Sequence, residues 1–132
     1  MATDVVLYLT YAETVFLHFE QMQAAGEVRY GIADRNLIKS ALARPPASAI
    51  YEYADVVRQA ATLYFGFVKN HPWLGGNKRT ASAIVDAFLM LNGCQIKASK
   101  DEIIELVLAI KANRYKVDEI EEWLRERIVT FE

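Results

Sequence analysis

Two segments with apolar residues at every third or fourth position flank Pro72, and they constrain the fold of this chain more than any other feature of its sequence. Their apolar positions are Val56, Val57, Ala60, Ala61, Tyr64, Phe65 and Val68 before the proline, and Ala81, Ile84, Val85, Phe88, Leu89 and Leu91 after it. This spacing places apolar side chains on one face of a helix. Because proline restricts the residue before it and cannot continue a helix interior, the first helix should end near His71. Asn92 and Gly93 are typical of the end of the second helix.

The connection between these two predicted helices, residues 70–80, reads Asn-His-Pro-Trp-Leu-Gly-Gly-Asn-Lys-Arg-Thr. A helix N-terminus carries roughly half a positive charge and several unpaired N–H groups, so Lys78 and Arg79 in a first turn are unfavourable unless an anion lies among them. A phosphate group would supply that anion. The sequence therefore predicts a phosphate site at the start of the second helix.

The other residues of this connection predict its local structure. We expect the side chains of Trp73 and Leu74 to anchor the loop by burial. Gly75 and Gly76 allow positive φ angles, or a close approach of backbone N–H groups to a ligand.

The same stretch contains groups suited to phosphate transfer. His71 can accept a proton near neutral pH, and beside a bound triphosphate it could take the proton of an incoming hydroxyl as that hydroxyl attacks phosphorus. Asn77 could cap the second helix and contact phosphate. Lys78 and Arg79 would offset phosphate charge, Arg79 through paired donors. Each residue alone is usually a cap or a solvated surface group, but their order at one helix start favours a phosphate site.

The string from residue 71 to residue 81 resembles the signature loop of the Fic/Doc (Fido) superfamily. In that loop a histidine, a proline, an aromatic, an acidic or variable position and a glycine or alanine precede Asn-Gly-Arg or Asn-Lys-Arg. The string is similar to the Doc (death-on-curing) branch, because Lys78 stands where AMP-transferring Fic enzymes have glycine and Ser82 replaces their second arginine. Residues 31–34 and 43–45 also look Doc-like.

The resemblance implies an activity. It implies a toxin of a toxin–antitoxin pair that transfers the γ-phosphate of ATP to a Thr or Ser hydroxyl of an elongation factor Tu-like translation factor, which halts translation. It assigns His71 and Arg79 to catalysis, and Gly76, Asn77, Lys78 and Arg79 to the nucleotide phosphates. ATP is the implied co-substrate, accompanied by Mg²⁺. The implied partners are the protein substrate and an antitoxin protein whose disordered segment folds onto the toxin.

Gly75 departs from the family pattern, because it stands where the family usually has an Asp or Glu that holds Mg²⁺. Magnesium usually needs one or two carboxylates beside phosphate oxygens, and Asp86 lies about two turns further along the helix, too far to replace one. No metal ligand is therefore assigned. Three interpretations stay open: a Doc-type kinase attenuated by Gly75, a Fic-type nucleotidyl (AMP) transferase, and a catalytically silent Fido module that binds nucleotide or a partner protein. Lys78 and Ser82 count against the second, and Gly75 supports the third.

Composition restricts the remaining functional classes. The 132 residues suit a single Fic/Doc domain spanning residues 1–132, and 53% hydrophobic and 24% charged residues are typical of a globular chain. A net charge of −2 argues against DNA or RNA partners. The single cysteine, Cys94, excludes an internal disulfide and is expected to be a buried thiol in a reducing cytoplasm. No signal peptide or membrane span is evident, so we expect a cytoplasmic protein without a membrane partner.

The segments before the central pair of helices follow from cap signals. Residues 5–9 predict a brief strand or an extended lead-in, and a capping box at Thr10 and Glu13 begins a helix that ends near residue 25. The apolar side of this helix is expected at Val15, Phe16, Phe19 and Met22. His18, on the same helix, is interpreted as a surface or hydrogen-bonded histidine.

A short helix should follow Asp34 as its N-cap and end at Pro45 and Pro46, leaving residues 45–51 as a loop or flap beside the active loop. In the family that the motif resembles, the corresponding region is an edge that positions the target polypeptide, and a plain connector is the alternative interpretation.

The C-terminal third predicts one short extended piece and two helices. Residues 94–96 are extended, a capping box at Ser99 and Glu102 begins the first helix, and the last helix covers about residues 117–128. The predicted fold is all-α, a compact bundle of about six helices with little or no sheet.

Overall fold

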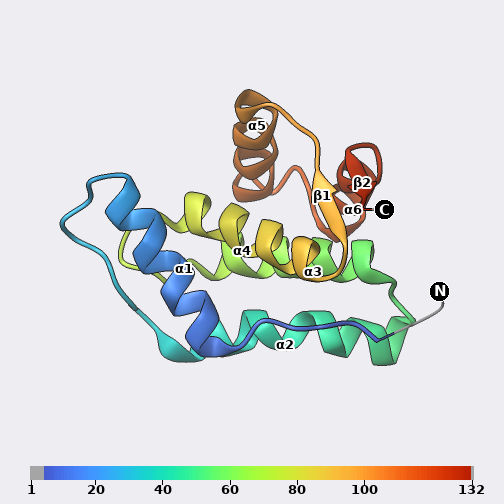
Figure 1. The fold of residues 1–132 in the computed structure, drawn as a ribbon, viewed down its shortest axis with the longest axis horizontal. Coiled ribbons are helices and arrows are strands. Elements are labelled where there is room, and N and C mark those ends of the chain that lie inside the picture. The colour runs from blue at the N-terminus through green and yellow to red at the C-terminus, as the bar shows by residue number, and fades with distance from the viewer. Residues whose placement is uncertain (1–4, 132) are drawn as a thin grey trace.

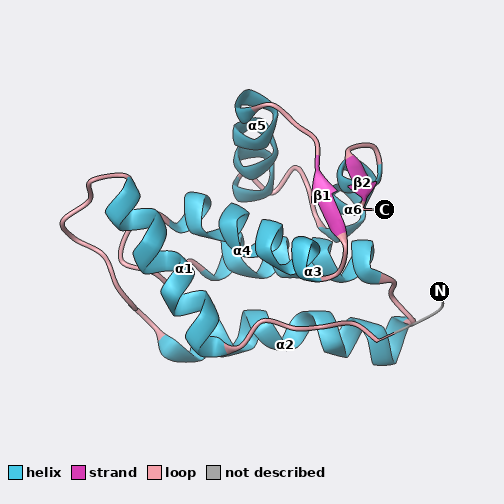
Figure 2. Ribbon diagram, viewed as in Figure 1, coloured by secondary structure: helices cyan, strands magenta, loops and turns pink. Residues whose placement is uncertain are grey.

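The computed structural model describes residues 5–131, which form six α-helices and one small antiparallel sheet (Figures 1 and 2). The elements are α1 (Tyr11–Ala24), α2 (Arg35–Glu52), α3 (Val56–Asn70), α4 (Asn77–Leu91), β1 (Cys94–Ile96), α5 (Lys100–Lys111), α6 (Val117–Arg125) and β2 (Ile128–Thr130). The predicted helical bundle with little sheet is confirmed. None of the described helices is long and apolar enough to cross a bilayer.

Helix α3 lies at the centre of the bundle. It contacts α2, α4, α5 and α6, and in Figure 1 α2 lies on one side of it while α5 and α6 lie on the other. Its side chains Leu63, Tyr64 and Phe67 are fully buried. Burial of one such side chain stabilises a fold by about 1.5–3 kcal/mol. These buried side chains therefore hold α3 firmly in place.

The helix ends follow the local signals in the sequence. Both predicted capping boxes form, with Thr10 at the start of α1 and Ser99 at the start of α5. Asn92 is the C-cap of α4, as predicted. Its side chain also exchanges two hydrogen bonds with the backbone of Leu7, which ties residues 5–10, an extended lead-in, to the end of α4.

Helix α2 continues through Pro45 and Pro46, so the predicted loop at residues 45–51 is wrong. A proline in a helix interior removes a backbone donor and costs about 3 kcal/mol or more. Close packing against α3 offsets this cost, since a Cβ on Gly66 would lie only 3.2 Å from the Cβ of Ala41. The packing of α2 against α3 therefore decides the conformation of residues 45–51, and no local sequence pattern encodes this packing.

The buried face of α1 also differs from the predicted one. Phe16 is 64% exposed and Phe19 is 40% exposed, whereas Thr14 and His18 are fully buried beside Met22. The two polar side chains are buried because they find hydrogen-bond partners inside the fold, which removes most of the cost of burying them.

At the C-terminal end, α6 stops at Arg125 and residues 128–130 form β2, so the predicted extension of the last helix to residue 128 is wrong. Strand β2 pairs with β1, with Ile128 opposite Ile96. β-branched residues favour strands when a partner strand is available, and this partner lies far away in the sequence. Cys94 in β1 is buried, and burial raises the pKa of its thiol, as expected for a structural thiol.

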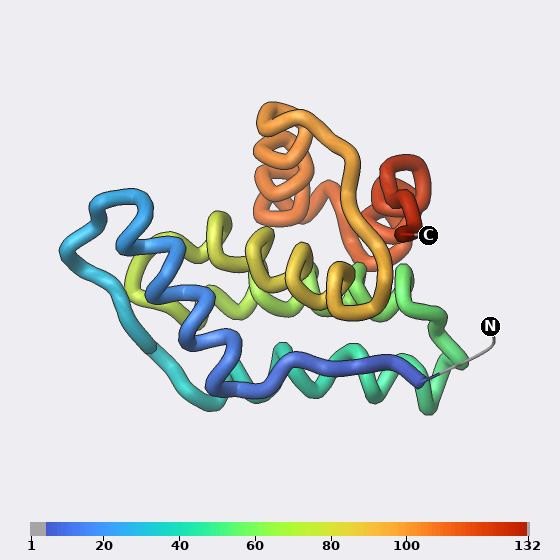
Figure 3. Tube along the Cα trace, in the orientation of Figure 1, coloured from blue at the N-terminus to red at the C-terminus, as the bar shows by residue number. Residues whose placement is uncertain are grey.

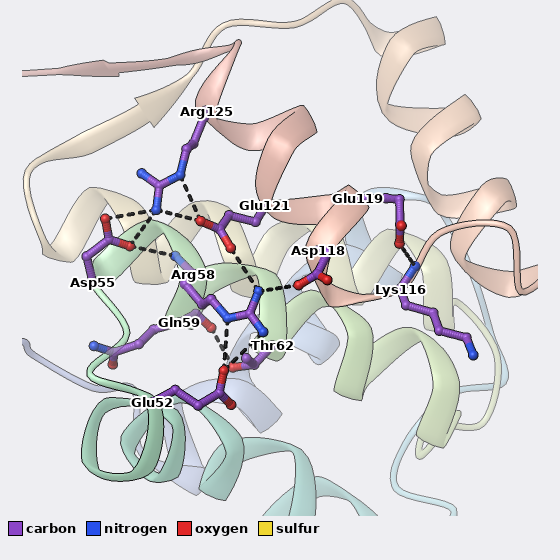
Figure 4. Close-up of polar contacts among 10 residues, drawn as sticks. All are labelled: Glu52, Asp55, Arg58, Gln59, Thr62, Lys116, Asp118, Glu119, Glu121 and Arg125. Carbon is purple, nitrogen blue, oxygen red and sulfur yellow. Dashed lines mark hydrogen bonds and ion pairs between the residues drawn. The ribbon is translucent and has the colours of Figure 1, made fainter.

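An ion-pair network holds the start of α3 against α2 and α6 (Figure 4). The Arg58 guanidinium contacts the carboxylates of Glu52 at 3.0 Å, Asp118 at 2.6 Å and Glu121 at 2.9 Å. Glu121 also contacts Arg125 at 2.7 Å. Burial raises the pKa of Glu121, but its bonds to the two arginines outweigh burial and hold the pKa below its ordinary value.

We expect Arg58→Ala to lower the free energy of unfolding by about 1–3 kcal/mol, because Glu121, whose side chain is 21% exposed, loses a cationic partner. Urea unfolding followed by circular dichroism measures this change. Arg114, an exposed arginine outside the ion pairs of the described residues, provides the control: Arg114→Ala should change stability by less than about 0.5 kcal/mol. Equal losses in the two variants would contradict a stabilising network.

Candidate functional site

The motif loop, residues 71–76, joins the end of α3 to the start of α4. His71 is the C-cap of α3 with a φ of 54°, and Gly75 and Gly76 follow with φ angles of 82° and 64°. A left-handed conformation costs a non-glycine residue about 1–2 kcal/mol. The loop therefore holds His71 in a strained conformation that the two packed helices maintain.

The segment between α1 and α2, residues 25–34, lies against the motif loop (Figure 3). The N–H of Leu74 donates to the carbonyl of Gly31 at 2.8 Å, and the N–H of Ala33 donates to the carbonyl of Pro72 at 2.9 Å. This segment borders the loop in the place where the sequence predicted the flap. Its last residues, 31–34, are among those that resemble the Doc sequences.

Asn77 braces the inside of the loop. Its Oδ1 accepts the Trp73 N–H at 2.9 Å, and its Nδ2 donates to the Trp73 carbonyl at 2.9 Å and lies 3.4 Å from Nδ1 of His71. The predicted capping role of Asn77 is wrong, because Gly76 is the N-cap and makes no side-chain cap bond. Trp73 is buried as predicted, but Leu74 is 51% exposed, so its predicted burial is wrong.

One cavity of about 1000 Å³ brings the candidate residues together. His71, Gly76, Asn77, Lys78 and Arg79 line its polar end. Its other walls are mainly apolar and come from α1, α4 and α5, including Leu17, Ala83, Ala87, Met90, Ile103, Ile104 and Val107. No ion pair among residues 5–131 involves Lys78 or Arg79. With the uncapped N-terminus of α4, these cations form a positive region open to an anion.

Lys111 is a further cation beside this region, and sequence reasoning missed it. The Lys111 ammonium, followed by burial, lowers the pKa of Lys78. Like charges in proximity repel each other, and an anion that both contact removes this cost. A lysine in the last turn of α5 is an ordinary helix-end residue in the sequence, so only the folded chain places it here.

Gly75 leaves room for a side chain, but residues 5–131 supply no group of metal ligands around it. A Cβ on Gly75 would meet only the Arg29 carbonyl oxygen, at 3.7 Å. Among the described residues, Asp86 is the only carboxylate that lines the cavity, and it lies about 13 Å along α4 from the helix start. Burial raises the pKa of Asp86. Among the described residues no group of three or more His, Cys, Asp or Glu side chains could hold a metal ion, so these residues do not fit Mg²⁺.

Ser82, which replaces the second family arginine, has a structural partner. Its Oγ lies 2.6 Å from the hydroxyl of Tyr64, a buried residue of α3. Burial raises the pKa of Tyr64, so this hydroxyl stays neutral. Ser82 thus offers the cavity a hydroxyl in place of a cation.

Gly76 and Gly75 differ in what surrounds them. A Cβ on Gly76 would overlap the thioether of Met22, which is fully buried, whereas Gly75 has open space. We expect Gly76→Ala to lower the free energy of unfolding by about 2–4 kcal/mol, through positive φ and overpacking, and Gly75→Ala by only about 1–2 kcal/mol. Urea unfolding of both variants tests this order, which the opposite ranking would refute.

His18 gives the fold a dependence on pH. Burial lowers its pKa from 6.5 to about 4. Because the folded pKa lies below the unfolded pKa, burial of the neutral ring is fully stabilising above pH 6.5. The free energy of unfolding then falls as the pH drops from 6.5 through 4. We expect a loss of about 3 kcal/mol over this range, measured by urea unfolding at several pH values. His18→Phe should flatten the curve between pH 6.5 and 4, and an unchanged slope would count against this origin.

Comparison with known proteins agrees with this geometry. The sequence model of the Fic/DOC family matches residues 8–89, from the lead-in through most of α4, including the whole motif loop. The chain is also similar to a protein named Toxin Doc from Mycolicibacterium smegmatis, with 35% identity over 94 residues, which cover 67% of this chain and 72% of that relative. The match to the family covers more than half of the chain. The chain therefore belongs to the Fic/Doc family, and within it to the Doc branch.

Proposed function

We propose that this chain is the toxin of a toxin–antitoxin pair, and that it transfers the γ-phosphate of ATP to a Thr or Ser hydroxyl of an elongation factor Tu-like translation factor, which halts translation. The observation that carries the proposal is that His71 and the cationic start of α4 line the same cavity. Similarity to a protein named Toxin Doc supports the role as a toxin. An antitoxin protein and the translation factor are the expected partners.

The start of α4 binds the phosphates of ATP in this proposal. Its first-turn N–H groups have no side-chain cap, and the helix dipole favours negative charge there. Arg79 offers paired donors to two phosphate oxygens, while Lys78 and Lys111 act as point charges. A phosphate between the two lysines also removes the repulsion that lowers the pKa of Lys78.

His71 accepts the proton of the substrate hydroxyl. The side-chain nitrogen of Asn77 lies 3.4 Å from Nδ1 of the ring, and the neutral ring accepts the proton through its unprotonated nitrogen. As the proton leaves, the hydroxyl oxygen bonds to the γ-phosphorus, and the bond from that phosphorus to the bridging oxygen breaks to release ADP. Arg79 meets the negative charge on the transferring phosphoryl oxygens. The apolar walls of the cavity, formed by residues such as Ile103 and Met90, leave space for the adenine base.

Magnesium that accompanies ATP would be held by phosphate oxygens and water, because the described residues do not fit a protein-held site. No step in the proposed transfer depends on a metal ligand from this chain. Gly75 would then attenuate the enzyme without abolishing the phosphate site.

A catalytically silent binding module is the second candidate, and Gly75 is the observation that favours it. Without a carboxylate at this position, the cavity could bind nucleotide or a partner protein without transfer. Nucleotidyl transfer has less support. Ser82 supplies no second cation for the α- and β-phosphates, and its hydroxyl already contacts Tyr64.

The proposal is tested by incubating the purified chain with Mg²⁺, elongation factor Tu and ATP labelled at either the α or the γ position. We expect γ-label on the translation factor and at least about a hundredfold loss of transfer in His71→Ala, because a positioned general base contributes about 10²–10⁴-fold. The control is Lys116→Ala, an exposed residue at the start of α6 that does not line the cavity, and this variant should transfer normally.

The same assay separates the alternatives. Label from the α position would assign nucleotidyl transfer and overturn the kinase proposal. Absence of transfer in the native chain together with transfer by Gly75→Asp would show an attenuated toxin, since position 75 has room for the added carboxylate. Absence of transfer in both proteins, with ATP still bound, would leave the silent module as the better description.

A further inference from the structure

His18 lies where α1, the segment 25–34, the motif loop and α4 meet. Its side chain is fully buried, and its ring contacts all three of the other segments, through Gly31, Trp73 and Thr80 among others. None of these three residues is a candidate phosphate ligand. Trp73 and Thr80, however, are bonded to residues that line the polar end of the cavity, Trp73 to Asn77 and Thr80 to Gly76.

The two ring nitrogens of His18 have different and fixed roles. Nε2 lies 3.0 Å from the backbone N–H of Gly31, which can only donate. Nε2 must therefore carry the lone pair, and the proton of the neutral ring is on Nδ1. Nδ1 lies 2.9 Å from Oγ1 of Thr80 and donates to it. Thr80 is on the first turn of α4, where its N–H bonds to the carbonyl of Gly76.

The face of the His18 ring lies on Trp73. The two rings are nearly parallel, with centroids 4.3 Å apart and an angle of 13° between them. The backbone of Trp73 in turn makes both hydrogen bonds to the side chain of Asn77. The imidazole is thus in contact with the loop through its face and with α4 through its edge.

We propose that His18 is a positioning residue of the candidate site, which sets the distance between the motif loop and the start of α4 through Trp73 and Thr80. The inference rests on the proposed phosphate transfer at this site. The general base, His71, belongs to the loop, whereas Lys78 and Arg79 belong to the helix, so this distance decides how the base meets the bound phosphate. Displacement of a reacting group by about 1 Å can cost about a hundredfold in rate.

The chemistry of the contact separates positioning from simple filling of the core. Phenylalanine at position 18 would keep an aromatic face on Trp73 but would leave the Gly31 N–H and the Thr80 hydroxyl without their partner. Valine at position 80 keeps the shape of threonine without its hydroxyl, and serine at the same position keeps the hydroxyl. Phenylalanine at position 18 and valine at position 80 thus remove hydrogen bonds while the volume near the ring changes little, whereas serine at position 80 removes only a methyl group.

The test compares His18→Phe, Thr80→Val and Thr80→Ser with the native chain. Ile120→Val, a mild core substitution on α6 away from the cavity, is the control for a loss of stability. Phosphate transfer gives kcat and the KM of ATP, and two-dimensional NMR of the ¹⁵N-labelled chain gives the backbone amide shifts. We expect kcat to fall about tenfold or more in His18→Phe and Thr80→Val, with the KM of ATP changed less than about threefold. Thr80→Ser should retain most of kcat, and the shift changes should extend to residues 77–79.

Two results would overturn the inference. One is a kcat that falls as much in Ile120→Val as in His18→Phe. The other is a set of amide shift changes confined to Gly31, Trp73 and Thr80, with residues 77–79 unmoved. If the native chain transfers no phosphate, the proposed function fails, and the amide shifts alone decide whether His18 positions the start of α4. If His18→Phe does not fold, the comparison of Thr80→Val with Thr80→Ser tests the same inference.

Discussion

Burial of α3 against four other helices is the constraint on which the candidate site depends. Because its side chains are buried along most of its length, α3 cannot shift, and its last residue fixes where the motif loop begins. Helix α4 packs against α3, so the loop must reverse the chain within six residues. His71, Gly75 and Gly76 accommodate this reversal with positive φ angles. Core packing thereby maintains the strained backbone at the site.

The charges of the molecule are distributed unequally along α3. Near its start, Arg58 and Arg125 are paired with carboxylates from α2, from α6 and from Asp55, the N-cap of α3. Near its end, Lys78 and Arg79 lack carboxylate partners among the described residues. The chain therefore has a local positive region although its net charge is −2. Such a region attracts an anionic ligand at one place without making the whole surface bind polyanions.

Much of the fold could be predicted because its signals are local. A capping box lies within four residues, and the apolar repeat of an amphipathic helix needs only two or three turns to be visible. Thr10, Ser99 and the ends of the helices on either side of Pro72 follow these signals. Errors arose where distant contacts outweigh local preference. Pro45 stays helical because α2 packs against α3, and Ile128 forms a strand because β1 lies beside it.

The sequence by itself determined the chemistry of the motif: a histidine, two glycines, an amide and two cations in an order that places them together across one helix start. Only the tertiary structure decided what surrounds that motif. Lys111 lies more than 30 residues after Lys78, and His18 reaches Thr80 across 62 residues. No local pattern reports such contacts, because they depend on how whole helices pack. The order of residues within one turn fixes which groups a site has, and the packing of helices fixes where those groups lie.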